Sequence, residues 1–129
     1  MPMAYLLSAH AIRAARIAFW LALTLLSILF LLPQHYLASG VFDWWDKLQH
    51  ALAFGVLTIL GLLAYATNKT PLQKQSHRIV VAMVLYGALI EVLQSVSGWR
   101  YGEFGDWAAD VVGVLLAWLL FVMANRQSP

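Results

Sequence analysis

Four long apolar segments, separated by short connectors, dominate this chain of 129 residues. Hydrophobic residues make up 62% of the sequence and charged residues only 11%, which is under half of the roughly 25% found in ordinary soluble domains. One small core cannot hide so much apolar surface from water, so a soluble enzyme is nearly excluded. The apolar segments are residues 17–32, 48–66, 79–96 and 107–124.

The length of each segment is close to the roughly 20 residues that a helix needs to cross the hydrocarbon of a membrane. We therefore expect an all-α membrane protein, with residues 1–129 forming a single transmembrane domain. Connectors of at most about 15 residues favour neighbouring helices packed antiparallel in a bundle. With some extension into the flanks, the four predicted helices cover about residues 14–32, 47–66, 78–96 and 106–124.

The first apolar segment also has a feature of signal peptides, because Arg13 and Arg16 precede its apolar run. The run is long for the hydrophobic part of a signal peptide, and no convincing cleavage site of small residues stands near Ala38 and Ser39. We therefore expect this segment to remain as the first membrane span.

Composition also narrows the classes of partner. The chain has no cysteine, which excludes disulfides, thiolate metal sites and dithiol redox chemistry. The sequence pI is near 9.2, but the cations are scattered and form no basic stripe, so no nucleic-acid partner is expected. The lipid bilayer is the partner that the composition predicts.

The charged residues are divided between the two ends of the predicted bundle. Lys and Arg in short connectors stay on the cytoplasmic side of a membrane, so we expect both termini to be cytoplasmic. Six cations lie on that side: Arg13, Arg16, Lys69, Lys74, Arg78 and Arg126; Lys47 and Arg100 lie on the other. All six acids belong to the outer connectors or the outer ends of helices: Asp43, Asp46, Glu91, Glu103, Asp106 and Asp110.

Polar residues of three predicted helices meet at this outer level. Asp46 and His50 are four residues apart and share one helical face, as do Asp106 and Asp110. Glu91 lies about 8 Å below the interface, where a carboxylate normally faces the bundle and finds a partner. We therefore predict one shallow, outward-facing polar pocket.

Several roles remain open for these side chains. Glu91 has a structural alternative, in which it pairs with Arg100 or accepts a hydrogen bond from Gln94. For His50, a bond to Asp46 serves equally a buried neutral imidazole and a base or proton carrier. A metal site of His50, Glu91 and Asp110 is conceivable, but no two-His motif is present and three helices would have to supply the ligands, so we expect neither a metal nor another cofactor.

Three motifs occur in order between residues 46 and 113. The first is D-K-x-x-H with a following Phe54, the second is E-x-x-Q, and the third is R-x-x-E-x-x-D-x-x-A-D-x-x-G. Over residues 43–120 this set resembles the VanZ-like family, with two departures: the family often has Asn where Asp110 stands and Gly where Ala117 stands. The motif residues are Asp46, Lys47, His50, Glu91, Gln94, Arg100, Glu103, Asp106, Ala109, Asp110 and Gly113.

The resemblance implies a small multi-pass protein of the bacterial cytoplasmic membrane. That family is named for an accessory factor in resistance to teicoplanin, a glycopeptide antibiotic that acts on cell-wall precursors at the outer surface. This location agrees with the outward polar pocket, and resistance is one role that the resemblance suggests for a cell-envelope protein of this kind.

We therefore favour a non-enzymatic protein whose pocket binds a polar headgroup, a wall precursor or a membrane partner. In that function Lys47 and Arg100 meet phosphate or carboxylate groups, and the acids orient these cations or accept hydrogen bonds. One alternative is a membrane-embedded enzyme for a lipid-linked substrate, with His50 as base or nucleophile. Another is an ion or proton pathway through Glu91 and Asp110. The predicted binding residues are Asp46, Lys47, His50, Glu91, Gln94, Arg100, Glu103, Asp106 and Asp110.

Overall fold

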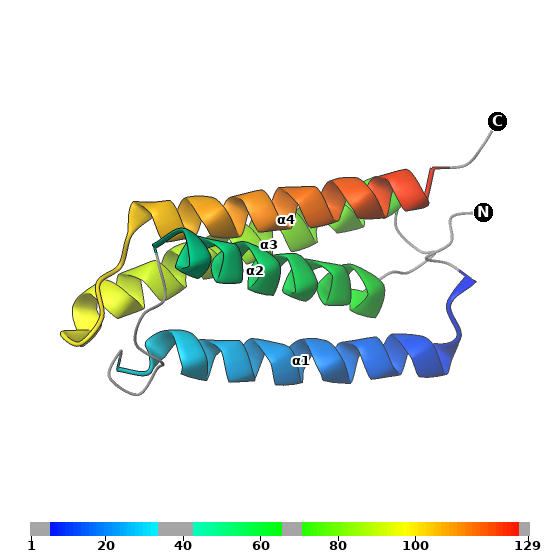
Figure 1. Cartoon of the computed structure of the whole chain (residues 1–129). Coiled ribbons are helices and arrows are strands. Elements are labelled where there is room, and N and C mark those ends of the chain that lie inside the picture. The colour runs from blue at the N-terminus through cyan, green and yellow to red at the C-terminus, as the bar shows by residue number, and fades with distance from the viewer. Residues whose placement is uncertain (1–5, 34–42, 66–70, 127–129) are drawn as a thin grey trace.

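The computed structural model describes residues 6–33, 43–65 and 71–126, without the side chains of residues 43 and 44. The described residues form four helices that run alternately up and down along one long axis (Figure 1). The helices are α1 (Ala9–Leu31), α2 (Asp43–Tyr65), α3 (Leu72–Ser97) and α4 (Phe104–Ala124). Each is long and apolar enough to cross a membrane, so the predicted all-α architecture with four membrane-spanning helices is confirmed.

All four helices begin earlier than the apolar pattern indicates, and the difference is largest for α1 and α3. α1 starts at Ala9 because the Ser8 hydroxyl accepts a hydrogen bond from the Ala11 N–H at 3.1 Å and caps the helix. α3 starts at Leu72, directly after Pro71, whose fixed φ suits the start of a helix. Polar residues thus lengthen both helices beyond their apolar spans.

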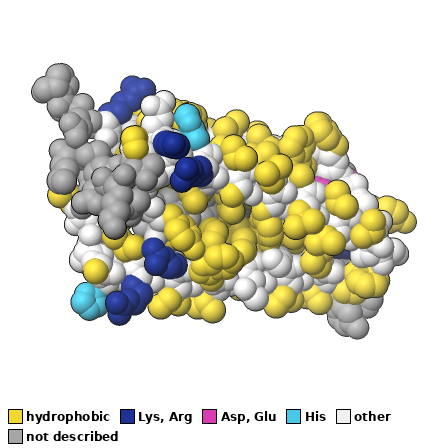
Figure 2. Space-filling view, turned by 180° about the vertical axis from the view of Figure 1, so that it is seen from behind, with side chains coloured by type: hydrophobic (Ala, Val, Ile, Leu, Met, Phe, Trp, Pro, Cys, Tyr) yellow, Lys and Arg dark blue, Asp and Glu magenta, His cyan; other side chains and the backbone are white. Residues whose placement is uncertain are grey.

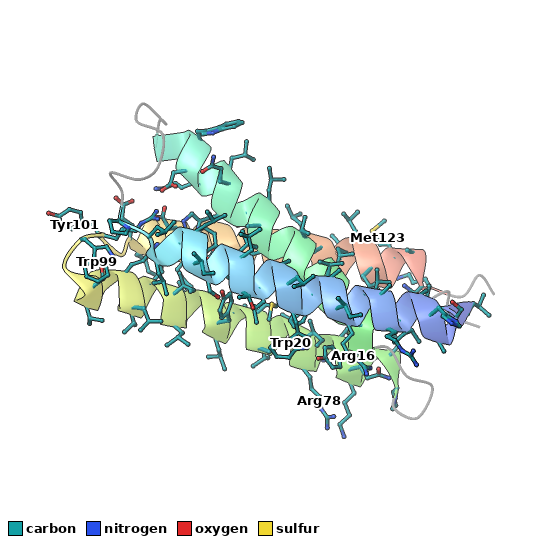
Figure 3. The ribbon with its side chains drawn as sticks, turned by 90° about the horizontal axis from the view of Figure 1, so that it is seen from below. Arg16, Trp20, Arg78, Trp99, Tyr101 and Met123 are labelled. Atoms are coloured by element: carbon teal, nitrogen blue, oxygen red, sulfur yellow. The ribbon has the colours of Figure 1, made fainter. Side chains whose placement is uncertain are left out.

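The surface of the bundle is itself apolar. Hydrophobic side chains cover much of its length, whereas Lys and Arg gather near one end (Figure 2). Arg16 and Arg78 lie at that end, and Trp99 and Tyr101 lie at the other (Figure 3). Large side chains such as Leu85 and Leu120 are 64% exposed, an arrangement that suits lipid rather than water. The protein is a multi-pass membrane protein.

Small residues bring α2 and α4 into close contact. A Cβ atom added at Gly113 would overlap the backbone of Ala51, and one at Gly55 would lie 3.5 Å from the Gly113 carbonyl oxygen. Such contacts are typical of membrane helices that pack through glycine. Ala51, Gly55 and Gly113 thus mark where the two helices approach closely, and this approach sets how near the polar side chains of α2 and α4 can come.

Candidate functional site

A buried contact between α2 and α4 forms the centre of the site. The Nδ1 atom of His50 lies 2.9 Å from Oδ1 of Asp110, and both side chains are fully buried. The Phe30 ring of α1 stacks on the imidazole, with ring centroids 4.5 Å apart. On α3, Gly87 leaves room for the carboxylate, because a Cβ there would approach Asp110 Oδ2 to 2.9 Å. All four helices therefore enclose the pair.

Asp46 is not the group that holds Nδ1 of His50, so that part of the sequence interpretation is corrected. The spacing of four residues does place Asp46 on the same face, and its carboxylate lies within 4.8 Å of the ligand atoms of His50 and Asp106. The ring, however, bonds across the helix interface, since the close approach of α2 and α4 brings Asp110 within reach.

Lys47 connects the buried centre to the edge of the bundle. Its Nζ atom lies 3.2 Å from Oε2 of Glu103 and 3.2 Å from Oδ1 of Asp106. The Nε2 atom of His50 lies 3.9 Å from the other oxygen of Asp106, which is too long for a hydrogen bond. Gly105 accommodates the lysine stem, because a Cβ there would lie 2.8 Å from Lys47 Cε.

Glu91 is held by the α3–α4 connector rather than by a cation. Its Oε2 accepts a hydrogen bond from the Glu103 backbone N–H at 2.8 Å, while the buried Oε1 has no partner among the described residues. Gly102 allows this, since a side chain there would overlap Ser95 and the Glu91 backbone. The alternative in which Glu91 pairs with Arg100 is not seen, because no ion pair joins these two described side chains.

Gln94 and Arg100 contact the end of α1. The last carbonyls of a helix have no partner within it, and here three side chains donate to them. Gln94 Nε2 donates to the Phe30 carbonyl at 2.8 Å, Trp99 Nε1 to Leu31 at 3.0 Å, and Arg100 to Leu29 at 3.2 Å. A cation is also favourable beside a helix C-terminus. These contacts give both predicted site residues a structural role.

Seven of the nine predicted residues therefore come together, and we refer to them as the polar cluster. Gln94 lies beside it, and Arg100 is directed toward α1. The sequence did not single out Phe30, because an apolar ring carries no chemical signal. The polar cluster consists of Asp46, Lys47, His50, Glu91, Glu103, Asp106 and Asp110.

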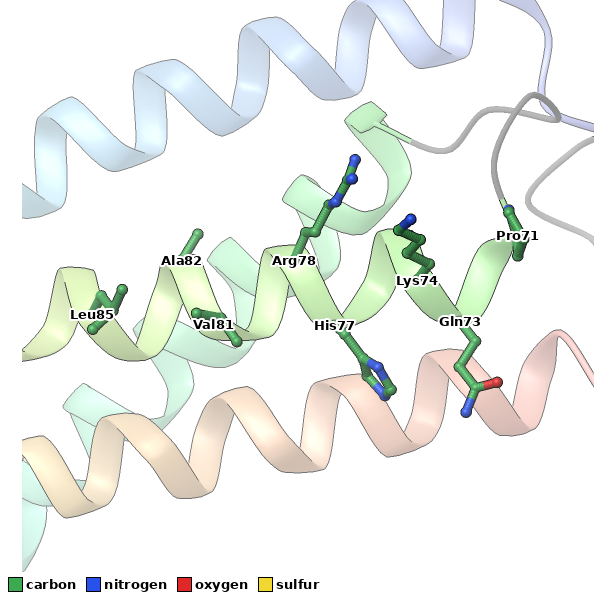
Figure 4. Close-up of a pocket in the computed structure, with 8 residues that line it drawn as sticks. All are labelled: Pro71, Gln73, Lys74, His77, Arg78, Val81, Ala82 and Leu85. Atoms are coloured by element: carbon green, nitrogen blue, oxygen red, sulfur yellow. The ribbon is translucent and has the colours of Figure 1, made fainter.

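A groove of about 330 Å³ opens between α3 and α4 beside Glu91. Its polar lining is Glu91, Ser95 and Glu103, and its apolar lining includes Val92 and Trp107. A larger hollow, of about 710 Å³, lies along α3 at the opposite end of the bundle and is lined partly by Lys74, His77 and Arg78 (Figure 4). Of these two hollows, the one beside Glu91 adjoins the polar cluster.

Two sets of ligand atoms within the described residues are compact enough for a metal ion. One set is Asp46, His50 and Asp106, and the other is His50, Glu91 and Asp110; in each, the atoms lie within 4.8 Å of one another. The expectation of no metal rested on ligands having to come from three helices. Close packing of α2, α3 and α4 brings such ligands together.

The profile of the VanZ/LLP1 family matches residues 5–125. No curated protein and no solved structure is significantly similar to the chain. The match covers nearly the whole chain and all residues of the polar cluster. The resemblance carried by the three motifs is therefore confirmed, and this four-helix membrane protein belongs to the VanZ/LLP1 family.

Proposed function

We propose that this protein of the bacterial cytoplasmic membrane binds the ammonium-bearing polar part of a lipid or lipid-linked wall precursor. The polar cluster faces outward, and the ligand enters the groove between α3 and α4. The observation that carries the proposal is Oε1 of Glu91, a buried acceptor with no donor in the described part of the chain, on a residue that lines this groove. A buried acceptor without a donor is unfavourable, and a ligand ammonium supplies the donor.

The charge of the cluster supports a cationic ligand. Five carboxylates stand against one ammonium group, that of Lys47, and Lys47 already contacts both Glu103 and Asp106. Arg100 donates to a carbonyl of α1. Lys47 and Arg100, which were first expected to bind phosphate or carboxylate, therefore already have partners within the protein. The hydrogen-bond acceptors of the polar cluster outnumber its donors. This balance favours a ligand that brings hydrogen-bond donors.

The lining of the groove also suits a lipid. Ser95 and Glu103 lie near the end of the bundle, while Ala88 on α3 and Trp107 on α4 lie about one to two helical turns farther along. A headgroup thus meets polar side chains and an acyl chain meets apolar ones. The excess of Lys and Arg at the opposite end supports an outward orientation of this groove.

Headgroup chemistry gives the test. Native mass spectrometry of the full chain in detergent compares retention of phosphatidylethanolamine with that of phosphatidylcholine, whose quaternary ammonium has no N–H. One charge-assisted hydrogen bond of about 1.5 kcal/mol corresponds to about tenfold tighter retention of phosphatidylethanolamine. Equal retention of the two lipids by the wild-type chain contradicts the proposal.

Two variants locate the effect. Glu91→Gln can keep the hydrogen bond from the Glu103 N–H, but it replaces the free acceptor by a donor. The ratio of phosphatidylethanolamine to phosphatidylcholine retention is therefore expected to fall to near one. Lys74→Gln, in the hollow at the other end, keeps the preference. Competition by an amine-bearing lipid-linked wall precursor distinguishes the two sources: displacement of phosphatidylethanolamine identifies the precursor as the tighter ligand, and no displacement identifies the phospholipid.

A role in glycopeptide resistance is part of this proposal. A protein that occupies lipid-linked precursors at the outer surface reduces what the antibiotic can reach. Teicoplanin sensitivity of a susceptible strain expressing the wild-type chain is expected to fall, and expression of Glu91→Gln is expected to leave it unchanged. If the wild-type chain and the Glu91→Gln variant protect the strain equally, resistance does not depend on ligand binding in the groove.

One observation favours a second function, a membrane-embedded enzyme. Nε2 of His50 has no hydrogen-bond partner among the described residues while Asp110 holds Nδ1, an arrangement that suits a general base. Mass spectrometry of a purified lipid-linked precursor incubated with the full chain is the test. A product formed by the wild type and lost in His50→Gln supports the enzyme, and an unchanged precursor supports binding alone.

A further inference from the structure

Two hydrogen-bond acceptors face each other near the centre of the polar cluster. Nδ1 of His50 has a carboxylate oxygen of Asp110 at 2.9 Å, so Nδ1 carries the hydrogen and Nε2 of the neutral ring presents a lone pair. Nε2 is buried, has no hydrogen-bond partner within residues 6–33, 43–65 and 71–126, and lies 3.9 Å from Oδ2 of Asp106. Neither atom supplies the other with a hydrogen, so a donor or a cation between them would satisfy both.

The spacing fits a metal ion. Two bonds of about 2.1 Å span up to about 4.2 Å, and the separation of Nε2 from Asp106 Oδ2 is 3.9 Å. Asp46, one helical turn before His50, offers a third atom within 4.8 Å of the others. We propose that Asp46, His50 and Asp106 bind a divalent transition-metal ion.

Asp110 then acts as a positioning residue. Histidine ligands usually donate their second ring N–H to a carboxylate, which fixes the tautomer and the ring orientation. The His50–Asp110 bond is of this kind, and the Phe30 ring stacked at 4.5 Å further restrains the imidazole.

The other compact set, His50, Glu91 and Asp110, is a poorer ligand set. Oδ1 of Asp110 is already hydrogen-bonded to Nδ1 of His50, and Oε2 of Glu91 already accepts a hydrogen bond from the Glu103 N–H. The proposed set of Asp46, His50 and Asp106 offers one imidazole nitrogen and two carboxylate oxygens, which suit ions such as Zn²⁺ and Mn²⁺.

Charge agrees with this assignment. Within the polar cluster, five carboxylates face the single ammonium of Lys47, and Asp106 is itself buried. A divalent ion offsets two of the surplus negative charges, and buried charges are normally paired or bound to metals. The acids are Asp46, Glu91, Glu103, Asp106 and Asp110.

Metal titration of the full chain in detergent, after treatment with a chelator, tests the site. We expect one Zn²⁺ or Mn²⁺ per wild-type chain. Asp46→Asn and Asp110→Asn each weaken affinity by about tenfold or more, whereas Glu91→Gln leaves it unchanged. A wild-type chain that binds neither ion overturns the proposal, and so does loss of affinity in Glu91→Gln with retention in Asp46→Asn. The Glu91→Gln variant also separates this site from lipid binding, because that substitution removes the preference for phosphatidylethanolamine.

A measurement on the unmutated chain guards against variants that fail to fold. Electron spin echo spectra of the Mn²⁺-loaded protein report nitrogen nuclei bonded to the metal. In the unmutated chain, a nitrogen coupling that changes when histidine is labelled with ¹⁵N shows that a histidine binds the metal. A control variant that lacks His10, His35 and His77 keeps the coupling if that histidine is His50. Spectra without nitrogen coupling overturn the assignment.

Discussion

The imidazole of His50 on α2 is hydrogen-bonded to the carboxylate of Asp110 on α4, with 2.9 Å between Nδ1 and Oδ1. Both side chains are fully buried. The contact depends on the glycine packing below it, where Gly113 lies against the backbone of Ala51. Packing and chemistry are therefore joined: the distance between two helices sets which carboxylate meets the histidine.

The partner of His50 can be identified from stability. Asp110→Leu leaves the buried Nδ1–H without an acceptor and is expected to reduce the free energy of unfolding by about 1–2 kcal/mol, as polar contacts between membrane helices do. Asp46→Leu removes a half-buried carboxylate that does not hold Nδ1 and has a smaller effect. Thermal unfolding in detergent provides the comparison. A larger loss in Asp46→Leu would restore Asp46 as the partner.

The packing of α2 on α4 makes a second prediction. Gly113→Ala places a methyl group into the Ala51 backbone and should destabilise the fold by about 1–3 kcal/mol, as overpacking does. Gly55→Ala meets the nearest atom at 3.5 Å and should be close to neutral. Both variants are compared by thermal unfolding. Similar losses in the two would show that the helices do not approach most closely at Gly113.

Glu91 and Arg100 are expected to act independently. Glu91 is bonded to the Glu103 N–H and Arg100 to the Leu29 carbonyl, and residues without shared partners have effects that add within about 0.5 kcal/mol. A double-mutant cycle with Glu91→Gln, Arg100→Gln and the pair measures the coupling in unfolding free energy. Recovery of stability in the double mutant would reveal an ion pair in the membrane.

The orientation is predicted from the distribution of Lys and Arg. With six cations on one side and two on the other, the positive-inside rule places both termini in the cytoplasm. Reporter fusions at Ser39 and Asn125 should therefore report opposite sides, with Ser39 outside. A cytoplasmic Ser39 would put the polar cluster on the inner face and remove an outer-surface ligand from consideration.

The sequence was sufficient for the helices and for much of the polar cluster. Apolar segments of about 20 residues define membrane spans, and the three motifs share one end of the antiparallel bundle. Spacing along a helix also identified the face that carries Asp46 and His50. Such spacing describes one helix at a time. It predicts which residues share a face of that helix, but not which face of a neighbouring helix they contact.

Contacts between helices required the structure. The rotation of α2 against α4 decides that His50 meets Asp110, and this rotation follows from contacts at Gly113 and Gly87. The contact of Arg100 with α1 was equally hidden, because the acceptor is a backbone carbonyl and leaves no mark in the sequence.

Photocrosslinking tests lipid binding in the groove most directly. A benzophenone amino acid at Val92, which lines the groove, is compared with one at Leu89 on the same helix, outside it; the native side chains are 57% and 52% exposed. In native membranes, we predict that position 92 captures phosphatidylethanolamine or an amine-bearing wall precursor well above its share of the bilayer, and that Glu91→Gln removes this enrichment. Position 89 should capture lipids in proportion to the bilayer. The same lipid profile at both positions would contradict a specific ligand in the groove.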